Sequence, residues 1–451
     1  MTGVAMADRT SREIFLAAFA ELERRGAAGP VWLRELRRAA IARFAQRGLP
    51  TTRDEEWKYT SLTPLTALPL ALAVDGAGAG LAEEAIAPFW VGPASWRRLV
   101  FVNGRYVAKL SAIRPVPGDA RIGSLAEALI TDAEIVRSHF SATAGEPADA
   151  FGALNTAFWQ DGAFLQVPAG VSLEEPVQLL FVATTPEAAR ADHPRSLIVL
   201  GEGSSATLVE TYFALDGNAY LTNAVTELVL ASGAGVEHHK VVLESRGGFH
   251  VGRTRVRQSR DSRFASCSIV FGGRLVRNDV DAWLGGEGAE CTLSGLSVIG
   301  GRQHADTHTV VDHAQPRATS RQLYKGVLDG RARGVFNGRV IVRPGAIGTD
   351  AHQTNKNLLL SDGVEVDSKP QLEIFADDVK CSHGAADGQL AEEAIFYLKS
   401  RGLDEAAART LLTHGFANEV LGRIRVEPIR TWCERLLVAR LHRGRVVEDE
   451  I

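Results

Sequence analysis

The chain has 451 residues, 45% of them hydrophobic and 23% charged, with a formal net charge of −4. This length allows two or three domains with a substantial core, and the composition is typical of a globular protein. The acidic balance excludes a general nucleic-acid-binding protein, and no apolar run reaches the roughly 18 residues of a membrane span. The N-terminus lacks an apolar signal core, so we expect no export. Scattered cysteines without a CxxC pair (Cys267, Cys291, Cys381 and Cys433) indicate single thiols in a reducing cytoplasm.

Residues 1–150 are predicted to form a mainly helical N-terminal domain. Apolar residues recur there with the spacing of a buried helix face, first in Phe15, Ala18, Phe19 and Leu22 and then, after Pro30, in Leu33, Leu36, Ala40 and Phe44. Further along, the apolar residues 99–102 precede Asn103-Gly104, which predicts a strand followed by a tight turn.

Residues 151–384 are predicted to form a β-rich core. Short apolar runs such as VQLLFVA, SLIVL, TELVL and RVIVRP are separated by turns rich in Gly, Ser and Asp. Similar turns recur at 201, 232, 260 and 286, roughly 26 to 32 residues apart, a suitable length for one coil of a solenoid. The absence of helices between the strands argues against a doubly wound sheet. We therefore expect a β-helix, with a jelly roll as the main alternative.

One strand within this core shows its two faces clearly. In GVFNGRVIVR, alternation places Phe336, Val340 and Val342 on one side. The other side carries Asn337, Arg339 and Arg343.

Residues 385–451 are predicted to form a C-terminal helical domain. Gly402 is placed to end a first helix in a left-handed conformation, and Asp404 is placed to cap the next one. The apolar residues of the last predicted helix lie on one stripe: Ile429, Trp432, Cys433, Leu436, Leu437 and Leu441. Between 423 and 445 there are seven Arg and two Glu, which indicates either a solvated face or a docking surface for an acidic partner.

The common catalytic motifs are missing. The sequence contains no GxxxxGK[ST], no HExxH and no GxSxG, so it does not hold a nucleotide by a P-loop and lacks the simplest hydrolase signature. GEGSSA at 201–206 fits the loose dinucleotide-binding pattern, but no helical period follows it, so we interpret it as a turn of the solenoid.

Several histidines are candidate metal ligands. In QHADTHTVVDH, an extended chain places His304 and His308 on one face and His313 on the other. Such a pair with a carboxylate suits a cupin-like metal site, and solvent-facing strand residues are the simpler interpretation. His238 and His239 are neighbours and therefore point to opposite faces of a strand.

The pair Cys381 and His383 lies at the junction of the β-rich and helical regions. In an extended segment both side chains share one face, with their Cα atoms roughly 6–7 Å apart. A thiolate and an imidazole at that separation could converge on one soft or borderline metal ion. Because a closed structural site needs about four ligands, the pair indicates an open site completed by another chain, or else a buried cysteine beside a hydrogen-bonded histidine.

Long motifs around this pair resemble a known family. The run DSKPQLEIFADDVKCSHGAADGQLAEEAIFYLKSRGLDEAAARTLL at 367–412 closely resembles the C-terminal signature of SufD proteins. GRVIVRPGAIGTDAHQTNKNLLLSDGVEVD and the early RDEEWKYTSL at 53–62 are similar to the same SufB/SufD family, and the resemblance covers nearly the whole chain. SufB members typically carry a Glu-His-Glu-Ala type sequence where this chain reads Lys-Cys-Ser-His-Gly, so the resemblance is to SufD.

The resemblance implies a mainly β fold, a right-handed β-helix flanked by helical domains, in a non-enzymatic subunit of the iron–sulfur cluster assembly complex. The implied partners are a SufB-like paralogue and a SufC-like ATPase. The C-terminal helices, at about 388–445, would dock the ATPase, and the expected contact residues are Glu392, Glu393, Tyr397 and Arg401. An exposed β-helix edge would pair with a similar edge, either of the paralogue or, in the isolated chain, of a second copy.

The resemblance also assigns a role to His383 and Cys381. His383 would supply a ligand or a proton-linked contact to nascent iron–sulfur species held mainly by the partner's cysteine and carboxylate, and protonation of its imidazole would weaken that contact. Cys381 would assist as a thiolate. We expect no stably bound cofactor, only transient iron or a nascent cluster shared with the partner. A carbohydrate-active β-helix enzyme and a cupin using His304 and His308 are the alternatives, the first requiring a groove of clustered acids.

Overall fold

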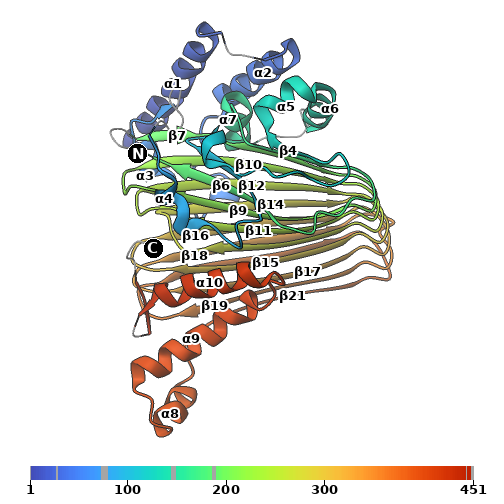
Figure 1. Cartoon of the computed structure of the whole chain (residues 1–451). Coiled ribbons are helices and arrows are strands. Elements are labelled where there is room, and N and C mark those ends of the chain that lie inside the picture. The colour runs from blue at the N-terminus through green and yellow to red at the C-terminus, as the bar shows by residue number, and fades with distance from the viewer. Residues whose placement is uncertain are drawn as a thin grey trace.

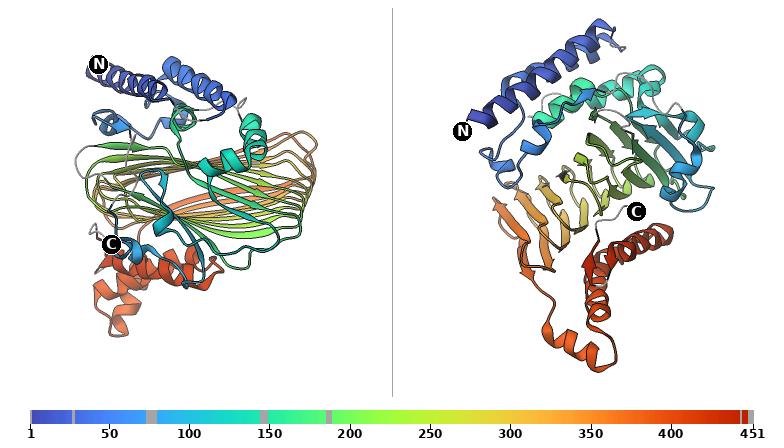
Figure 2. Two further views of the ribbon diagram at one scale, coloured as in Figure 1. Left: turned by 45° about the horizontal axis from the view of Figure 1, so that its top comes forward. Right: turned by 90° about the vertical axis from the view of Figure 1, so that its left-hand side faces the viewer.

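The chain winds into a β-solenoid of about eight turns, and its strands form two long, mainly parallel β-sheets that face each other (Figures 1 and 2). The computed structural model describes residues 2–26, 29–72, 80–143, 149–184, 189–442 and 444–447. Each turn of the solenoid contributes one strand to each sheet, and the neighbouring strands of successive turns pair in parallel. A jelly roll is built from antiparallel pairs, so this alternative is wrong.

The sheets are defined by their strand order. Sheet A runs through β4 (Arg121–Ser124), β5 (Ala163–Val167), β8 (Arg195–Leu200), β10 (Tyr220–Leu230), β12 (Gly248–Gln258), β14 (Leu275–Leu284), β16 (His304–His313), β18 (Arg333–Val342) and β20 (Glu365–Ile374), with β1 (Ala71–Leu72) and β7 (Arg190–Asp192) beside it. Sheet B runs through β3 (Arg105–Tyr106), β2 (Arg97–Val102), β6 (Val177–Ala183), β9 (Ser205–Ala214), β11 (Gly235–Leu243), β13 (Arg263–Val270), β15 (Glu290–Ile299), β17 (Thr319–Leu328), β19 (Asp350–Leu359) and β21 (Lys380–Gly388).

The turns between the sheets repeat as the sequence predicted. Residues that pair in sheet B are 27 to 31 residues apart from one turn of the solenoid to the next. At the turns near 201, 232 and 260, the residues Gly203, Gly233 and Asp261 all have positive φ, and each donates its backbone N–H to the turn of the next coil. Gly and Asp tolerate this left-handed conformation, which explains the repeated turn composition.

The core lies between the two sheets, where side chains alternate inward and outward. Phe336, Val340 and Val342 are buried inside, whereas Arg339 and Arg343 lie on the outer face of sheet A, which confirms the predicted alternation. The interior is apolar in most turns but also holds buried polar groups. Lys240 donates to Asn278 at 3.1 Å inside the middle turns, for example.

N-terminal elements cover one end of the solenoid. The predicted hairpin is present, because β2 pairs with β3 across Asn103 and Gly104, both with positive φ. The predicted apolar helix faces are buried, with Phe15, Phe19 and Phe44 in one core cluster. The helices in this part of the chain are α1 (Thr2–Arg24), α2 (Val31–Arg47), η1 (Glu55–Trp57), α3 (Thr63–Thr66), α4 (Glu83–Ile86), η2 (Ala87–Phe89), η3 (Ala108–Leu110), α5 (Leu125–Thr131), α6 (Ala133–Thr143) and α7 (Ala150–Phe158).

Three C-terminal helices follow the last strand: α8 (Glu392–Ser400), α9 (Glu405–Leu421) and α10 (Glu427–Arg440), before the short strands β22 (Leu441–His442) and β23 (Arg445–Val446). The apolar stripe of α10 packs with residues of sheet B in one core cluster. Gly402 has φ +94 after α8, and the Asp404 carboxylate accepts the Ala407 N–H at 2.7 Å, so both predicted helix signals are confirmed. Figure 1 shows α8 projecting away from the solenoid. Among the described residues, no helix is long and apolar enough to cross a membrane.

Candidate functional site

The C-terminal end of the solenoid is open. Strands β20 and β21 are the last strands of sheets A and B, and neither has a further strand partner in the described part of the chain. Lys380 donates its N–H back to Thr349. Backbone groups alternate in direction along a strand, so those of Cys381, His383 and Ala385 point to the free edge. This edge offers a ready template for another strand.

Cys381 closes the apolar core at this end. It pairs with Ala351 in the ladder and packs in a small cluster that includes Val340 and Ala346. Burial raises the pKa of the Cys381 thiol, although a hydrogen bond with the Ala351 backbone acts in the opposite direction. Less of the thiol is therefore ionised at neutral pH than in an exposed cysteine, which limits its strength as a metal ligand.

His383 lies on the same face of β21 as Cys381, two residues further along, as the spacing predicted. Its partner in the ladder is Gln353, which is 1% exposed, whereas His383 itself is exposed. Neither polar atom of the Gln353 side chain has a hydrogen-bond partner among the described residues. His383 therefore stands at the mouth of the solenoid, above an amide that retains free hydrogen-bonding capacity.

A polar network continues from this mouth into the last turn, and sequence reasoning missed it. The Asn357 amide donates to Asp387 at 2.7 Å and to Asn355 at 2.9 Å, and the Ser368 hydroxyl donates to Asn355 at 2.8 Å. Their inward positions in β19, β20 and β21 could be read from strand alternation, but only the stacking of the coils brings them together. The interior is therefore polar where it opens, as it also is around Lys240 and Asn278 in the middle turns.

The donor atoms at the open end are too few to enclose a metal ion. Within the described ranges, no group of three or more His, Cys, Asp and Glu side chains is placed to hold an ion. Cys381 and His383 remain as one sulfur and one nitrogen donor on a common face, half of the usual tetrahedral set. A metal bound by this pair would need its remaining ligands from elsewhere.

A second polar group lies on the outer side of the same edge. His352 Nδ1 lies 2.5 Å from the Ser382 hydroxyl, and its Nε2 lies 2.9 Å from Asp350. Arg321 also pairs with Asp350, at 2.6 Å. Of these contacts, only the exposed one between His352 and Ser382 joins β19 to β21, and the ion pair of Arg321 joins β17 to β19. Strand alternation predicts that these side chains point outward, but it does not predict that they meet across adjacent coils.

The expected partner-contact residues lie on and beside α8. Glu392, Glu393, Tyr397 and Arg401 are all exposed, and the Arg401 guanidinium lies 5.1 Å from the centre of the Tyr397 ring. The neighbouring Phe396 was not among the predicted residues, yet it is 74% exposed. Helix α8 thus leaves two aromatic side chains exposed, and aromatic residues are enriched in protein–protein interfaces.

The histidines of β16 differ in part from the simpler interpretation, in which they face solvent. His304 and His308 share the outer face and His313 lies inside against Ser320, as predicted, but His308 is 8% exposed and is not solvent-facing. The segment 53–62, here called the N-terminal strap, covers this face. His308 lies 3.0 Å from Asp306 and 3.3 Å from Glu56 of the strap.

Ionic contacts attach the strap to sheet A, and the β16 histidines take part in them. Arg277 binds Asp306 at 2.9 Å and donates to the Glu56 carbonyl at 2.6 Å, while Trp57 is buried with its ring 4.1 Å from the Arg277 guanidinium. A guanidinium competes for the carboxylate that a metal would need. The cupin-like site therefore lacks support, and the predicted opposite placement of His238 and His239 is seen in their separate partners, Glu210 and Glu237.

Comparison with known proteins identifies relatives along nearly the whole chain. Residues 15–179 match the SufBD protein N-terminal region, and residues 181–416 match the SufBD core domain of the SUF system for FeS cluster assembly. The chain is 33% identical to an iron–sulfur cluster assembly SufBD family protein of Synechocystis, over 83% of this chain and 84% of the relative. It is 32% identical to the iron–sulfur cluster assembly protein SufD of Escherichia coli, over 86% and 89%. SufD of Bacillus subtilis is 29% identical over 62% and 64%.

Proposed function

The chain belongs to the SufBD family of iron–sulfur cluster assembly proteins, and from this premise we propose that it is the SufD-type, non-catalytic scaffold subunit of a larger assembly complex. Its open end pairs with a homologous SufB-like subunit, and its C-terminal helices dock a SufC-like ATPase. The nascent cluster, or the iron that enters it, is the cargo of this complex rather than a resident cofactor. The dispersed free thiols suit a reducing cytoplasm.

The observation that carries this proposal is the open last coil. A solenoid end normally needs a cap, because its last turn leaves backbone groups and core residues uncovered. Here the last turn has a free strand edge and a row of exposed inward positions from His383 to Asp387. A homologous subunit presenting a similar edge would pair with it and extend both sheets across a pseudo-twofold interface.

The chemistry of the open end supports a shared cluster site. His383 offers a neutral imidazole nitrogen, a competent iron ligand, at a position that a docked subunit would enclose. Cys381 is the preceding inward-facing residue of β21, and burial raises the pKa of its thiol. His383 therefore serves as the main contribution of this chain to the cargo, and Cys381 assists once the site is closed and a metal displaces its proton.

The separate position of α8 supports the second contact. The chain carries no P-loop, so any nucleotide hydrolysis in the complex belongs to another subunit. Phe396 and Tyr397 are exposed on a helix that projects away from the solenoid, where a partner can reach both rings. A movement of the ATPase could thus pull on the solenoid through α9 and α10, which pack on sheet B.

An anaerobic pull-down of the tagged chain from its native host tests the proposal. We expect recovery of two proteins identified by mass spectrometry, a homologous β-solenoid subunit and a P-loop ATPase. A chain truncated after residue 385 loses part of β21 and all of α8, and should recover neither. Recovery of the intact chain without either partner would contradict the scaffold function.

A further inference from the structure

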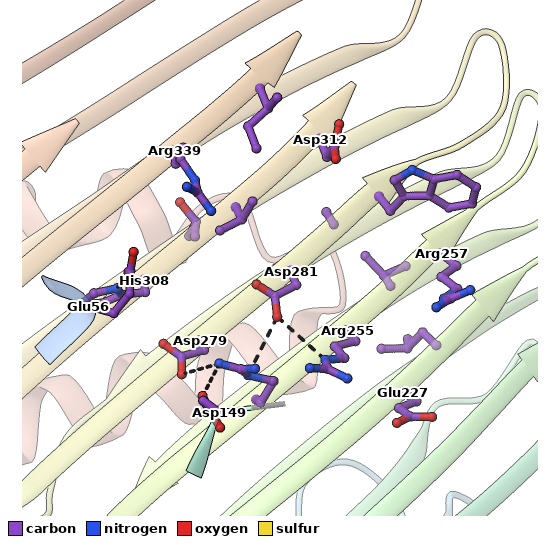
Figure 3. A pocket seen from close by; sticks show the side chains of 18 of the residues that line it. Glu56, Asp149, Glu227, Arg255, Arg257, Asp279, Asp281, His308, Asp312 and Arg339 are labelled. Carbon is purple, nitrogen blue, oxygen red and sulfur yellow. Dashed lines mark hydrogen bonds and ion pairs between the residues drawn. The ribbon is translucent and has the colours of Figure 1, made fainter. Parts of the chain in front are cut away.

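A deep groove crosses the outer face of sheet A. Its volume is about 960 Å³, and its floor is formed by outward-facing side chains of β12, β14, β16, β18 and β20. Strands in a sheet lie about 4.8 Å apart, so this floor extends for roughly 20 Å along the solenoid. Glu56 and Trp57 of the strap form one wall, and His139 of α6 and Asp149 before α7 line the N-terminal end. Figure 3 shows charged side chains from these elements directed into the groove.

The part of the groove near the strap and α7 is held together by its own ion pairs. Arg253 contacts Asp149 at 2.5 Å and Asp279 at 3.2 Å, and both carboxylates are labelled in Figure 3. Arg277 contacts Asp279 at 3.0 Å. The side chains of Arg277 and Asp279 are 3% and 5% exposed. Buried, fully paired charges of this kind fix the N-terminal elements onto the sheet and leave little capacity for a ligand.

The part of the groove farther from the strap, here called its outer part, contains an exposed indole in place of buried ion pairs. Trp283 is 47% exposed and projects from β14, and its ladder neighbours are Arg257 on one side and Asp312 on the other. A Cβ atom at Gly285 would lie 2.3 Å from the Trp283 ring. Glycine at 285 therefore lets the ring lie against the backbone with its other face towards the groove. The result is an aromatic platform surrounded by charge.

Two exposed guanidinium groups come from β18, two strands away from this platform. Arg343 makes a two-pronged contact with Asp312 at 2.8 to 3.2 Å, and its side chain is 55% exposed. Arg339, 38% exposed, lies 3.7 Å from Glu373, and its ladder neighbour Gln371 adds an amide donor. Exposed ion pairs of this type contribute little to stability, so a phosphate can recruit both guanidinium groups at low cost.

The balance of charge in this outer part favours an anion. The residues lining it include four arginines, Arg255, Arg257, Arg339 and Arg343, and three carboxylates, Glu227, Asp281 and Asp312. An arginine fork matches the oxygens of a phosphate in two parallel hydrogen bonds, and an exposed indole stacks on any planar ring. A ligand that carries both a phosphate and a planar ring would use the arginines and the indole together.

We propose that the outer part of the groove binds a small phosphorylated molecule that carries a planar ring. The ring stacks on Trp283, and the phosphate groups bind Arg339 and Arg343 with help from Gln371. This site goes beyond the scaffold function and is distinct from a P-loop site, which the chain lacks. The groove reaches β20, the last strand of sheet A, so its ligand would lie beside the coil that forms the open end.

Isothermal titration calorimetry of the purified full-length chain tests the site, with ADP, adenosine and pyrophosphate as probes. We expect ADP to bind more tightly than either fragment, because adenosine lacks the phosphates and pyrophosphate lacks the ring. Trp283→Ala and Arg343→Gln should each weaken ADP binding about 10-fold. Only the arginine variant should weaken pyrophosphate binding.

Matched controls separate the site from general effects. Phe375→Ala removes an aromatic ring that is 61% exposed after β20, and Arg302→Gln removes an exposed arginine outside the groove, so both should bind ADP as the unchanged chain does. All four positions are exposed, and a thermal melt of each variant verifies its fold. The proposal is overturned if the unchanged chain binds no ADP. ADP binding that survives both groove variants would overturn it too, as that pattern belongs to a contaminating ATPase.

Discussion

His383 and Gln353 are directly paired in adjacent strands of sheet B, yet Gln353 is 1% exposed and His383 is exposed. Both side chains occupy inward positions of the solenoid. The difference between them arises because a further coil covers Gln353 and none covers His383. The last turn thus presents residues of the interior type to any subunit that docks there, and such a subunit would bury His383 as β21 buries Gln353.

Replacing His383 should impair cluster assembly without affecting the fold. We expect His383→Ala to change the free energy of unfolding of the isolated chain by less than about 0.5 kcal/mol, because the side chain is exposed. On the reconstituted complex, cluster formation followed by visible absorbance should fall about 10-fold, a typical effect of losing one ligand-shell group. His352→Ala removes an exposed histidine from the outer side of the neighbouring strand and should leave assembly intact. Normal assembly with His383→Ala would exclude the proposed role.

Two proline substitutions in β21 should separate the free edge from the paired one. The backbone N–H of Ala385 points to the free edge, so Ala385→Pro should leave the chain folded and strongly reduce recovery of the paralogous subunit. The N–H of Ala386 points towards β19, so Ala386→Pro should lower the free energy of unfolding by about 1–3 kcal/mol. Partner recovery is measured by pull-down and stability by urea unfolding. If both variants recover the paralogue fully, it does not dock by strand pairing at this edge.

The exposed rings of α8 should be required for the ATPase and dispensable for the paralogue. We expect Tyr397→Ala and Phe396→Ala each to reduce ATPase recovery about 10-fold, because exposed aromatic residues commonly dominate the energy of such contacts. Recovery of the β-solenoid partner should not change. Val438→Ala alters a residue that is 60% exposed on α10 and serves as the control. An equal loss with this control would contradict a contact confined to α8.

Attachment of the strap to sheet A should depend on pH through His308. Burial by itself lowers the pKa of His308, but the charges of Asp306 and Glu56 outweigh burial and raise that pKa to about 9. Arg277, also packed against Asp306, opposes this increase. A pKa above the unfolded value of about 6.5 means that protonated His308 stabilises the folded chain fully below pH 6.5, and that this stabilisation disappears as the pH rises through about 9.

The comparison of His308→Gln with the unchanged chain measures this contribution. At pH 6 the variant should be less stable by about 1–3 kcal/mol in urea unfolding, and the difference should shrink as the pH approaches 9.5. His442→Gln, which replaces an exposed histidine of β22, is the control and should show no comparable trend. A difference that stays constant from pH 6 to 9.5 would show that His308 acts by packing alone.

Local sequence determined much of the fold and part of the site. Asn103-Gly104 specified a hairpin, Gly402 and Asp404 specified helix ends, and the recurring turns specified coils, because each of these signals depends on backbone preferences within a few residues. Strand alternation likewise placed Cys381 and His383 on one face of β21. The proposed role of this pair rests on the resemblance of the surrounding motifs to the family.

Only the tertiary structure decided how distant segments meet. His308 contacts Glu56 across 252 positions of sequence, and this contact turned an expected solvent-facing histidine into a buried cation. The stacking of coils also created the polar mouth around Asn357 and the groove around Trp283, whose residues come from strands that are about one coil apart in sequence. Periodicity tells which way a side chain points, but it carries no information on which coil, strap or helix lies opposite, because that depends on packing of the whole chain.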